Sequence, residues 1–127
     1  MLYKTLGKTG LNVSVIGFGA SPLGAEFGKV DPAEGLKAVD YAIDNGINYF
    51  DVAPYYGRTV AEKRLGAFLE GKRDRIYLAS KACRYDITDF EFTRRRIMRS
   101  IEESLARLRT DYLDVYQIHD VEYAHFE

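Results

Sequence analysis

Short apolar runs alternate with longer amphipathic stretches along this chain, and that alternation predicts an α/β fold. The apolar runs cover residues 15–19, 47–51, 75–80 and 113–118, and each is apolar at most of its positions. Strands of this kind are buried on both faces, as in a parallel sheet with right-handed helical crossovers. We therefore expect four parallel strands joined by helices in one domain over residues 1–127.

The stretch between the first two apolar runs carries the signals of a helix start and a helix stop. Asp31 suits the N-cap position, Pro32 the first helical position and Glu34 the third, where an acid is favourable. Asn45-Gly46 supplies the stop, because glycine readily adopts the left-handed conformation that follows many helices. The positions at helical spacing that we expect to be buried are Leu36, Val39, Ala42 and Ile43.

Two further amphipathic stretches predict helices over residues 60–69 and from a Thr93 cap to residue 107 or 108. The second helix is expected to bury Ala61, Leu65, Phe68 and Leu69. The third is expected to bury Ile97, Ile101, Leu105 and Leu108. The opposite face of the third helix carries charges, Arg107 among them, which we interpret as solvated helix surface rather than a binding patch.

The chain begins with a predicted β-hairpin. Extended pieces over residues 2–6 and 11–14 flank the turn 7–10, which has glycine at both ends. Residues 20–30, rich in Gly, and the mixed stretch 83–92 are expected to be irregular loops.

The composition indicates an ordinary globular protein and removes several function classes. The chain is 46% hydrophobic and 29% charged with a net charge of -1, so nothing in it favours nucleic acid or a membrane surface as a partner. Cys83 is the one cysteine, which excludes an internal disulfide and fits a reducing compartment. With only His119 and His125 as histidines, no His/Cys metal cluster is expected. No signal peptide or spanning segment is recognised, and we expect a cytoplasmic protein.

Four polar residues follow the predicted strands. Asp51 ends the second strand, and Tyr56 lies in the loop after it. Lys81 follows the third strand and His119 follows the fourth. Singly, they have ordinary explanations as a turn cap, a packed tyrosine, a snorkelling lysine and a structural histidine. Because equivalent ends of parallel strands meet at one rim, we expect all four to lie together.

Such a group can carry acid–base chemistry. A phenol is a poor acid at neutral pH, with an ordinary pKa of about 10, and an ammonium within hydrogen-bonding reach lowers that pKa. A carboxylate keeps the ammonium charged and oriented, and an imidazole can hold a substrate oxygen. A tyrosine in this setting can protonate a carbonyl oxygen as hydride arrives, or remove an alcohol proton in the reverse direction.

A longer motif surrounds Asp51 and Tyr56: it is Gly46-x-Asn48-x-Phe50-Asp51-x-Ala53-x-x-Tyr56-Gly57, with Glu62 and Leu65-Gly66 after it. On this motif the chain resembles the aldo-keto reductase family, and is closest to its L-galactose dehydrogenase and aldose 1-dehydrogenase-like branches. Further matches are Ser80-Lys81 and Ile118-His119-Asp120. The branch is indicated by Gly17-Phe18-Gly19-Ala20-Ser21-Pro22-Leu23-Gly24, by Pro54-Tyr55-Tyr56-Gly57, and by the run from Ser100 to Leu108 with Asp111-Tyr112-x-Asp114.

The resemblance implies a role for each candidate residue. Tyr56 would be the general acid and base, and Lys81 would lower the pKa of its phenol. Asp51 would pair with Lys81, and His119 would orient the carbonyl group. The positions that match residues near the cofactor are Gly19, Ala20, Ser21 and Asp51. The cofactor implied is NAD or NADP, with a sugar or small carbonyl compound as substrate and no metal.

A (β/α)8 barrel takes about 250 residues, and the chain looks like the N-terminal half of such a TIM barrel, with a hairpin and four strands. In the family the other half holds most of the pyrophosphate and adenosine. We therefore expect open sheet edges, an exposed inner face, and self-association or marginal stability. Apolar surface on one face or the other would come from Val15, Phe18, Tyr49, Ile76, Leu78, Val115 and Ile118.

Three functional hypotheses follow. The first is a nicotinamide-dependent oxidoreductase, of which this chain alone has little or no activity. The second is a non-catalytic half-barrel that serves as a folding or assembly module. The third is a domain that senses the cofactor by binding it without turnover.

Overall fold

A four-stranded parallel sheet forms the centre of the molecule in the computed structural model, which describes residues 1–124. Its strands lie in the order β3, β4, β5, β6. Their bounds are β3 (Phe18–Gly19), β4 (Tyr49–Asp51), β5 (Tyr77–Ala82) and β6 (Val115–Ile118). The predicted α/β class and the four parallel strands are confirmed. His125, named in the sequence analysis, lies outside the described residues.

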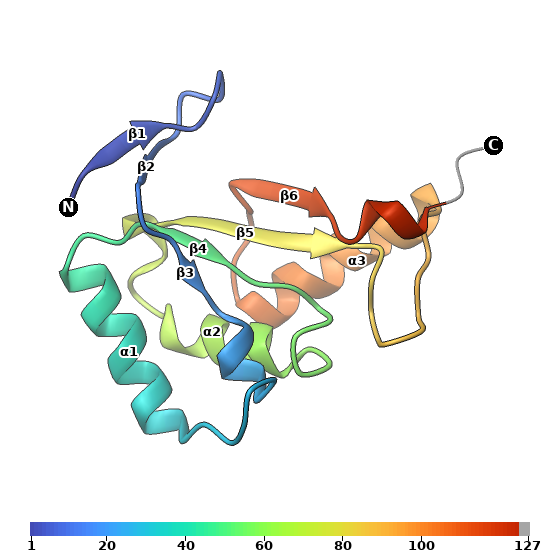
Figure 1. The fold of residues 1–127 in the computed structure, drawn as a ribbon, viewed down its shortest axis with the longest axis horizontal. Coiled ribbons are helices and arrows are strands. Elements are labelled where there is room, and N and C mark those ends of the chain that lie inside the picture. The colour runs from blue at the N-terminus through green and yellow to red at the C-terminus, as the bar shows by residue number, and fades with distance from the viewer. Residues whose placement is uncertain (125–127) are drawn as a thin grey trace.

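Three α-helices pack against one side of this sheet (Figure 1). They are α1 (Pro32–Asp44), α2 (Val60–Phe68) and α3 (Arg94–Leu108). Short 3₁₀ turns cover Ser21–Gly24, Arg73–Arg75 and Val121–Tyr123. Within residues 1–124, none of the helices combines the length and the apolar character that crossing a bilayer requires.

The ends of α1 form as the sequence predicts. The Asp31 carboxylate accepts a hydrogen bond of 2.7 Å from the backbone N–H of Ala33, and so caps one of the free donors of the first turn. Gly46, with φ of 84°, follows the C-cap residue Asn45. Val39, Ala42 and Ile43 are buried, but Leu36 is 36% exposed and Gly35 takes its place against the core.

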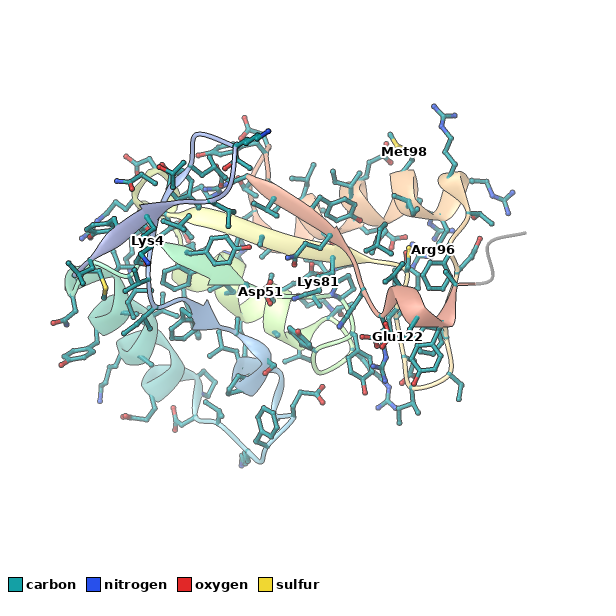
Figure 2. All side chains as sticks on the ribbon, turned by 45° about the horizontal axis from the view of Figure 1, so that its top comes forward. Lys4, Asp51, Lys81, Arg96, Met98 and Glu122 are labelled. Atoms are coloured by element: carbon teal, nitrogen blue, oxygen red, sulfur yellow. The ribbon has the colours of Figure 1, made fainter. Side chains whose placement is uncertain are left out.

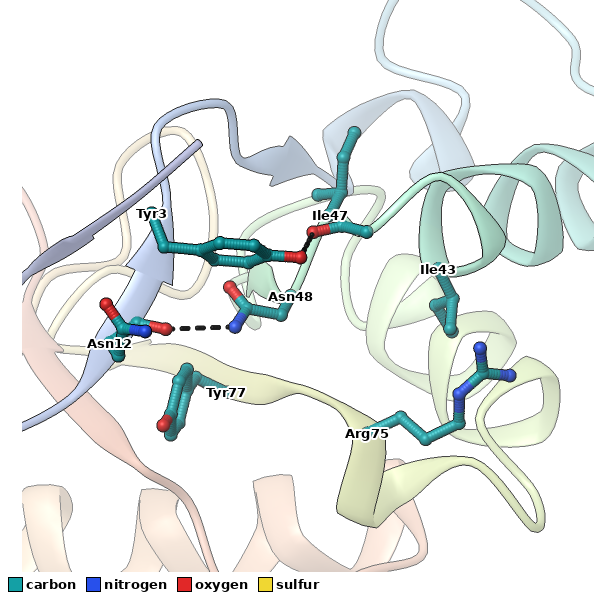
Figure 3. A pocket seen from close by; sticks show the side chains of 8 residues that line it. Tyr3, Asn12, Ile43, Ile47, Asn48, Arg75 and Tyr77 are labelled. Carbon is teal, nitrogen blue, oxygen red and sulfur yellow. Dashed lines mark hydrogen bonds between the residues drawn. The ribbon is translucent and has the colours of Figure 1, made fainter. Parts of the chain in front are cut away.

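An antiparallel hairpin of β1 (Tyr3–Thr5) and β2 (Asn12–Ser14) precedes the sheet, as predicted. Asn48 fixes it there, because its amide donates to the Asn12 carbonyl at 3.0 Å and accepts from the Ser14 N–H at 2.7 Å. A pocket lies between the hairpin and the start of β4 and β5 (Figure 3). The Tyr3 hydroxyl on its wall donates to the Gly46 carbonyl at 2.9 Å. This pocket therefore lies where the hairpin is attached to the rest of the molecule.

All four strands begin later than predicted, and β4, β5 and β6 each start two residues after the predicted first residue. The predicted first strand over residues 15–19 is reduced to two residues, and Val15 and Ile16 are 49% and 57% exposed. The Ser14 hydroxyl donates to the Ile16 carbonyl at 2.6 Å, which turns this segment away from the ladder. At the third strand, Lys81 is a member of β5 rather than the residue after it.

The layer between the sheet and helices contains a buried charge. Glu62 on α2 is fully buried, and its carboxylate accepts from the Ser80 hydroxyl at 2.7 Å and from the Arg107 guanidinium at 2.6 Å. Arg107 also donates to the Ser104 hydroxyl at 3.1 Å. Arg107 is therefore not solvated surface, as the sequence analysis expected, because the charge of Glu62 requires a partner in the core. Of the residues predicted to be buried on α3, Leu108 is buried, whereas Ile97, Ile101 and Leu105 are only partly buried. Ser100 and Ser104 complete the buried face of the helix.

The other side of the sheet carries no helix among the described residues. Phe50 and Leu78 point into the core cluster between the sheet and the helices. Their neighbours along the strands therefore point to the opposite face of the sheet. Tyr49 and Tyr77 lie on that opposite face and are partly exposed. Within residues 1–124, β3 and β6 each pair on one side only, and Ile118 at the β6 edge is 46% exposed. The predicted open edges and exposed inner face are thus present.

A close backbone contact fixes the loop between β4 and α2. Gly57 has φ of 58°, and a Cβ atom added to it would lie 2.2 Å from the carbonyl oxygen of Gly24. The loop 52–59 therefore packs on the 3₁₀ turn that follows β3, at a distance that only glycine permits.

We predict that Gly57→Ala lowers the free energy of unfolding by at least about 3 kcal/mol, because left-handed strain adds to a clash with the backbone. Gly7→Ala is the matched control, since Gly7 has φ of 54° and open space where its Cβ would lie. Urea denaturation of the control should show the cost of the strain alone, about 1–2 kcal/mol. Equal losses in the two variants would contradict the contact.

Candidate active site

Asp51 and Lys81 meet on the exposed face of the sheet, at the C-terminal ends of β4 and β5 (Figure 2). Asp51 is in register with Ala79, so Lys81 lies two residues further along β5 and points to the same face. The Lys81 ammonium forms an ion pair with the Asp51 carboxylate. The Lys81 side chain is 12% exposed and that of Asp51 is 27% exposed, so this ion pair is largely withdrawn from solvent.

The remaining hydrogen bonds of Lys81 reach the loop after β4. Its Nζ atom donates to the carbonyl oxygen of Val52 at 3.2 Å and to the hydroxyl oxygen of Tyr56 at 3.2 Å. An ammonium group has three N–H donors, and each has one acceptor here. Lys81 therefore connects the acid to the phenol, as the sequence analysis expected.

Tyr56 reaches this position through the fold of its loop. Its backbone N–H donates to the Ala53 carbonyl at 3.1 Å, and its carbonyl accepts from the Ala61 N–H of α2 at 3.2 Å. Tyr56 also packs against the hydrophobic core while its hydroxyl faces Lys81. The loop thus folds over the rim of the sheet and returns directly into α2.

His119 lies at the same rim, in the residue directly after β6. Its backbone N–H donates to the Ala82 carbonyl of β5 at 3.0 Å, which continues the parallel pairing by one residue. Its imidazole meets the Tyr56 ring edge to face, with centroids 5.7 Å apart. The structure therefore brings together all four residues that the sequence analysis grouped.

The electrostatic setting of His119 favours the neutral imidazole. Burial lowers the pKa of His119 below its usual value, and the cations Lys81 and Arg84 act in the same direction while Asp120 and Asp51 oppose it. Among the residues that the structure describes, the buried Nδ1 atom has no hydrogen-bond partner. The ring is 12% exposed at the site and so retains hydrogen-bonding capacity for a ligand.

The three loop residues expected near a cofactor lie beside Asp51. Gly19 is in register with Asp51, is exposed, and has no atom within 4 Å of the position a Cβ would occupy. Ala20 is fully buried, and its N–H donates to the Asp51 carbonyl at 2.8 Å. Ser21 opens the 3₁₀ turn and is partly exposed. This edge of the rim therefore has room for a ligand against the backbone of β3.

Three further residues at the rim were not predicted as site residues. The Arg84 guanidinium, from the loop after β5, forms an ion pair with Asp120 and lies 3.8 Å from the Tyr55 ring centroid. Tyr55 in turn meets the His119 ring edge to face at 6.0 Å. The sequence signal for Asp120 and Tyr55 was their position beside His119 and Tyr56, whereas Arg84 sits in a loop without a pattern.

The arrangement supplies the parts of a proton-transfer site. A phenol is placed against a charged ammonium, which stabilises the phenolate when a proton leaves. A carboxylate holds the ammonium, and a neutral imidazole faces the phenol across the open rim. Such a site can give a proton to a carbonyl oxygen or take one from an alcohol.

Comparisons with known proteins identify the family. The family model described as "Aldo/keto reductase family" matches residues 15–126. L-galactose dehydrogenase of Arabidopsis thaliana is 46% identical over 123 residues, which are 94% of this chain and 38% of that protein.

Solved structures extend the agreement to the fold. A putative aldo-keto reductase from Pseudomonas aeruginosa superposes with a TM-score of 0.85 at 38% identity, over 94% of this chain and 46% of that one. An aldo-keto reductase from Klebsiella pneumoniae in complex with NADPH superposes with a TM-score of 0.78 at 32% identity, over 94% of this chain and 40% of that one.

The chain spans less than half the length of these relatives, as the shares of 38%, 46% and 40% show. Its hairpin and four-stranded sheet correspond to the N-terminal half of the (β/α)8 barrel, which confirms the predicted fold class. The match of the family model over 15–126, with the superposition of the sheet on solved members, shows that the chain belongs to the aldo/keto reductase family.

Proposed function

We propose that this protein is a nicotinamide-dependent oxidoreductase that interconverts a carbonyl group and an alcohol on a sugar or small aldehyde. The observation that carries the proposal is the placement of the Lys81 ammonium between the Asp51 carboxylate and the Tyr56 hydroxyl. Lys81 directs its three N–H donors at the Asp51 carboxylate, the Val52 carbonyl and the Tyr56 hydroxyl, and so holds a carboxylate and a phenol in one place. The Lys81 side chain is also only 12% exposed, and removing its charge from water costs free energy. A role in chemistry explains why the protein keeps a charge at this place.

Tyr56 acts as the proton donor in the direction of reduction. Its phenolic proton passes to the carbonyl oxygen of the substrate, and the Lys81 ammonium stabilises the phenolate that is left. In the direction of oxidation, the phenolate accepts the proton of the alcohol. Asp51 holds the Lys81 ammonium in place and directed at the phenol throughout.

His119 positions the substrate oxygen. A neutral imidazole has one N–H donor, and the depressed pKa of His119 keeps the ring in that form near neutral pH. From its place edge to face with Tyr56, this donor directs the oxygen toward the phenol. Orientation of this kind, rather than proton transfer, is its role.

The cofactor that we propose is NAD or NADP, which supplies or accepts the hydride when bound. Gly19 and Ser21 would hold its nicotinamide ribose beside Asp51, because Gly19 leaves open space at the rim and lies in register with Asp51. Backbone at a glycine can approach a ligand more closely than at any other residue. Ala20 would contribute only through its position in the turn, since its side chain is buried.

The proposed substrate class follows the L-galactose dehydrogenase relative, which is 46% identical. An aldose offers the alcohol or carbonyl group that the Tyr56 and His119 pair can hold. We also propose a cytoplasmic location, because the single cysteine, Cys83, is buried and free and suits a reducing compartment.

A second candidate function is a non-catalytic half-barrel that assembles with another chain. The specific observation in its favour is the helix-free sheet face together with the open edges of β3 and β6 in the described residues. Calorimetric titration of the 127-residue chain with NAD(H) and NADP(H) separates the two candidates. Binding in the micromolar range supports the enzyme, and absence of binding supports the assembly module.

Tyr56→Phe is the most specific test of the proposed chemistry. We would assay it in a chimera that joins residues 1–127 to the part of Arabidopsis L-galactose dehydrogenase that follows the matched segment. The expected result is a loss of turnover of at least about 100-fold with cofactor binding retained, because the proton donor is removed and the ring is kept.

Tyr41→Phe is the matched control, because Tyr41 lies on α1 and is 73% exposed. Turnover should be unchanged in this variant. If Tyr56→Phe also keeps full turnover in the chimera, the proposed role of Tyr56 is wrong.

The open sheet edges and the exposed inner face predict that the 127-residue chain self-associates or aggregates. Ile118→Lys should reduce association by placing a charge on the β6 edge, where Ile118 is 46% exposed. Met98→Lys makes the same change on α3, at a residue that is 52% exposed, and should leave association unchanged. Size-exclusion chromatography with light scattering measures both; a wild-type monomer with cooperative melting would rule the prediction out.

A further inference from the structure

An ion pair closes the rim beside His119. The loop after β5 supplies Arg84, and the loop after β6 supplies Asp120. The ion pair therefore joins the two loops that leave these neighbouring strands at their C-terminal ends. Each side chain is 21% exposed. A pair that is this far withdrawn from solvent contributes more than a surface ion pair and is poorly screened by salt.

Asp120 stands between Arg84 and the imidazole. One carboxylate oxygen pairs with the Arg84 guanidinium, and the other lies 3.7 Å from Nε2 of His119. An unpaired carboxylate at that distance would strongly favour a proton on the ring. The guanidinium therefore offsets the influence of the carboxylate on His119.

Arg84 is itself held by aromatic rings. Its guanidinium lies 3.8 Å from the Tyr55 centroid and 5.3 Å from the Phe90 centroid. Tyr55 also packs against His119, with ring centroids 6.0 Å apart. A planar guanidinium can stack and bind a carboxylate at once, which a lysine ammonium cannot do equally well.

The backbone on both sides of the ion pair is unusual. Cys83, the residue before Arg84, has φ of 81°, and Asp120 has φ of 49°. Residues other than glycine are strained in this region because their Cβ atom approaches the backbone, and such residues cluster where surrounding contacts hold a site in shape. One strained position is therefore a member of the ion pair, Asp120, and the other directly precedes Arg84.

We propose that the Arg84–Asp120 ion pair is a positioning element for His119, which fixes the imidazole against Tyr56 and cancels the carboxylate charge that would otherwise draw a proton onto the ring. The inference rests on the proposed function, in which a neutral His119 donates a hydrogen bond to the substrate oxygen. Neither Arg84 nor Asp120 takes part in proton transfer.

The charged and titratable groups that face His119 come from three elements and their loops. They are Asp51, Tyr55, Tyr56, Lys81, Arg84 and Asp120. Burial is the main cause that lowers the pKa of the ring, and the Arg84 cation also lowers it. Loss of the Arg84 cation should therefore raise the pKa of His119. Loss of the Asp120 anion removes an influence that raises the pKa. The two substitutions must therefore shift the His119 pKa in opposite directions.

NMR titration of the histidine ring protons in the 127-residue chain measures this without cofactor or substrate. The chain has 2 histidines, so His119→Gln assigns the signals. Arg84→Gln is expected to raise the His119 pKa by about 0.5 or more, and Asp120→Asn to lower it by a similar amount. Arg84→Lys should keep the pKa closer to that of the wild type, because the charge remains.

Arg58→Gln is the matched control, since Arg58 forms an ion pair with Asp86 but is 68% exposed. It should leave the His119 pKa unchanged. The inference is overturned if Arg84→Gln leaves the pKa unchanged or lowers it, or if Arg84→Gln and Asp120→Asn shift it in the same direction, as a general opening of the site would do. Failure of the proposed function would instead appear as turnover retained by Tyr56→Phe, with these titration shifts intact.

Discussion

The site depends on a single cation, the ammonium of Lys81, held where three strand ends converge. Its three donors go to the Asp51 carboxylate, the Val52 carbonyl and the Tyr56 hydroxyl. The ammonium thereby fixes the loop after β4 to β5, and places the phenol opposite His119 at the open rim. The same contacts that position Lys81 also carry its electrostatic effect, because the Tyr56 hydroxyl both accepts a hydrogen bond from the ammonium and lies next to its charge.

Much of this was readable from the sequence, for a definite reason. Parallel strands bring equivalent ends to one edge, so Asp51, Lys81 and His119 had to meet if the apolar runs were strands. The helix starts were readable too, because Asp31 and Thr93 cap through local contacts with residues two or three positions ahead. Helix caps depend on residues close together in the sequence, and the meeting of strand ends depends on the order of strands and helices. Both can be read from the sequence.

The features that could not be predicted depend on contacts between distant segments. The sequence pattern places Arg107 on the solvated face of its helix, but in the structure it binds Glu62, which is buried on a neighbouring helix. The Ser14 hydroxyl, whose bond to the Ile16 carbonyl turns Val15 and Ile16 out of the first strand, is itself held by the backbone N–H of the distant Asn48. Arg84 lies in an irregular loop, and only the folded chain brings it to Asp120 and the Tyr55 ring. Spacing carries no information on such pairings.

The most direct measurement of the central claim is a double-mutant cycle on Asp51 and Lys81. Free energies of unfolding would be measured for Asp51→Asn, Lys81→Met and the double variant. If the ammonium holds the site together, each single substitution strands a partly buried charge, and the coupling energy should exceed about 1 kcal/mol. Additive losses, within about 0.5 kcal/mol, would show that the two side chains do not depend on each other and would contradict the account.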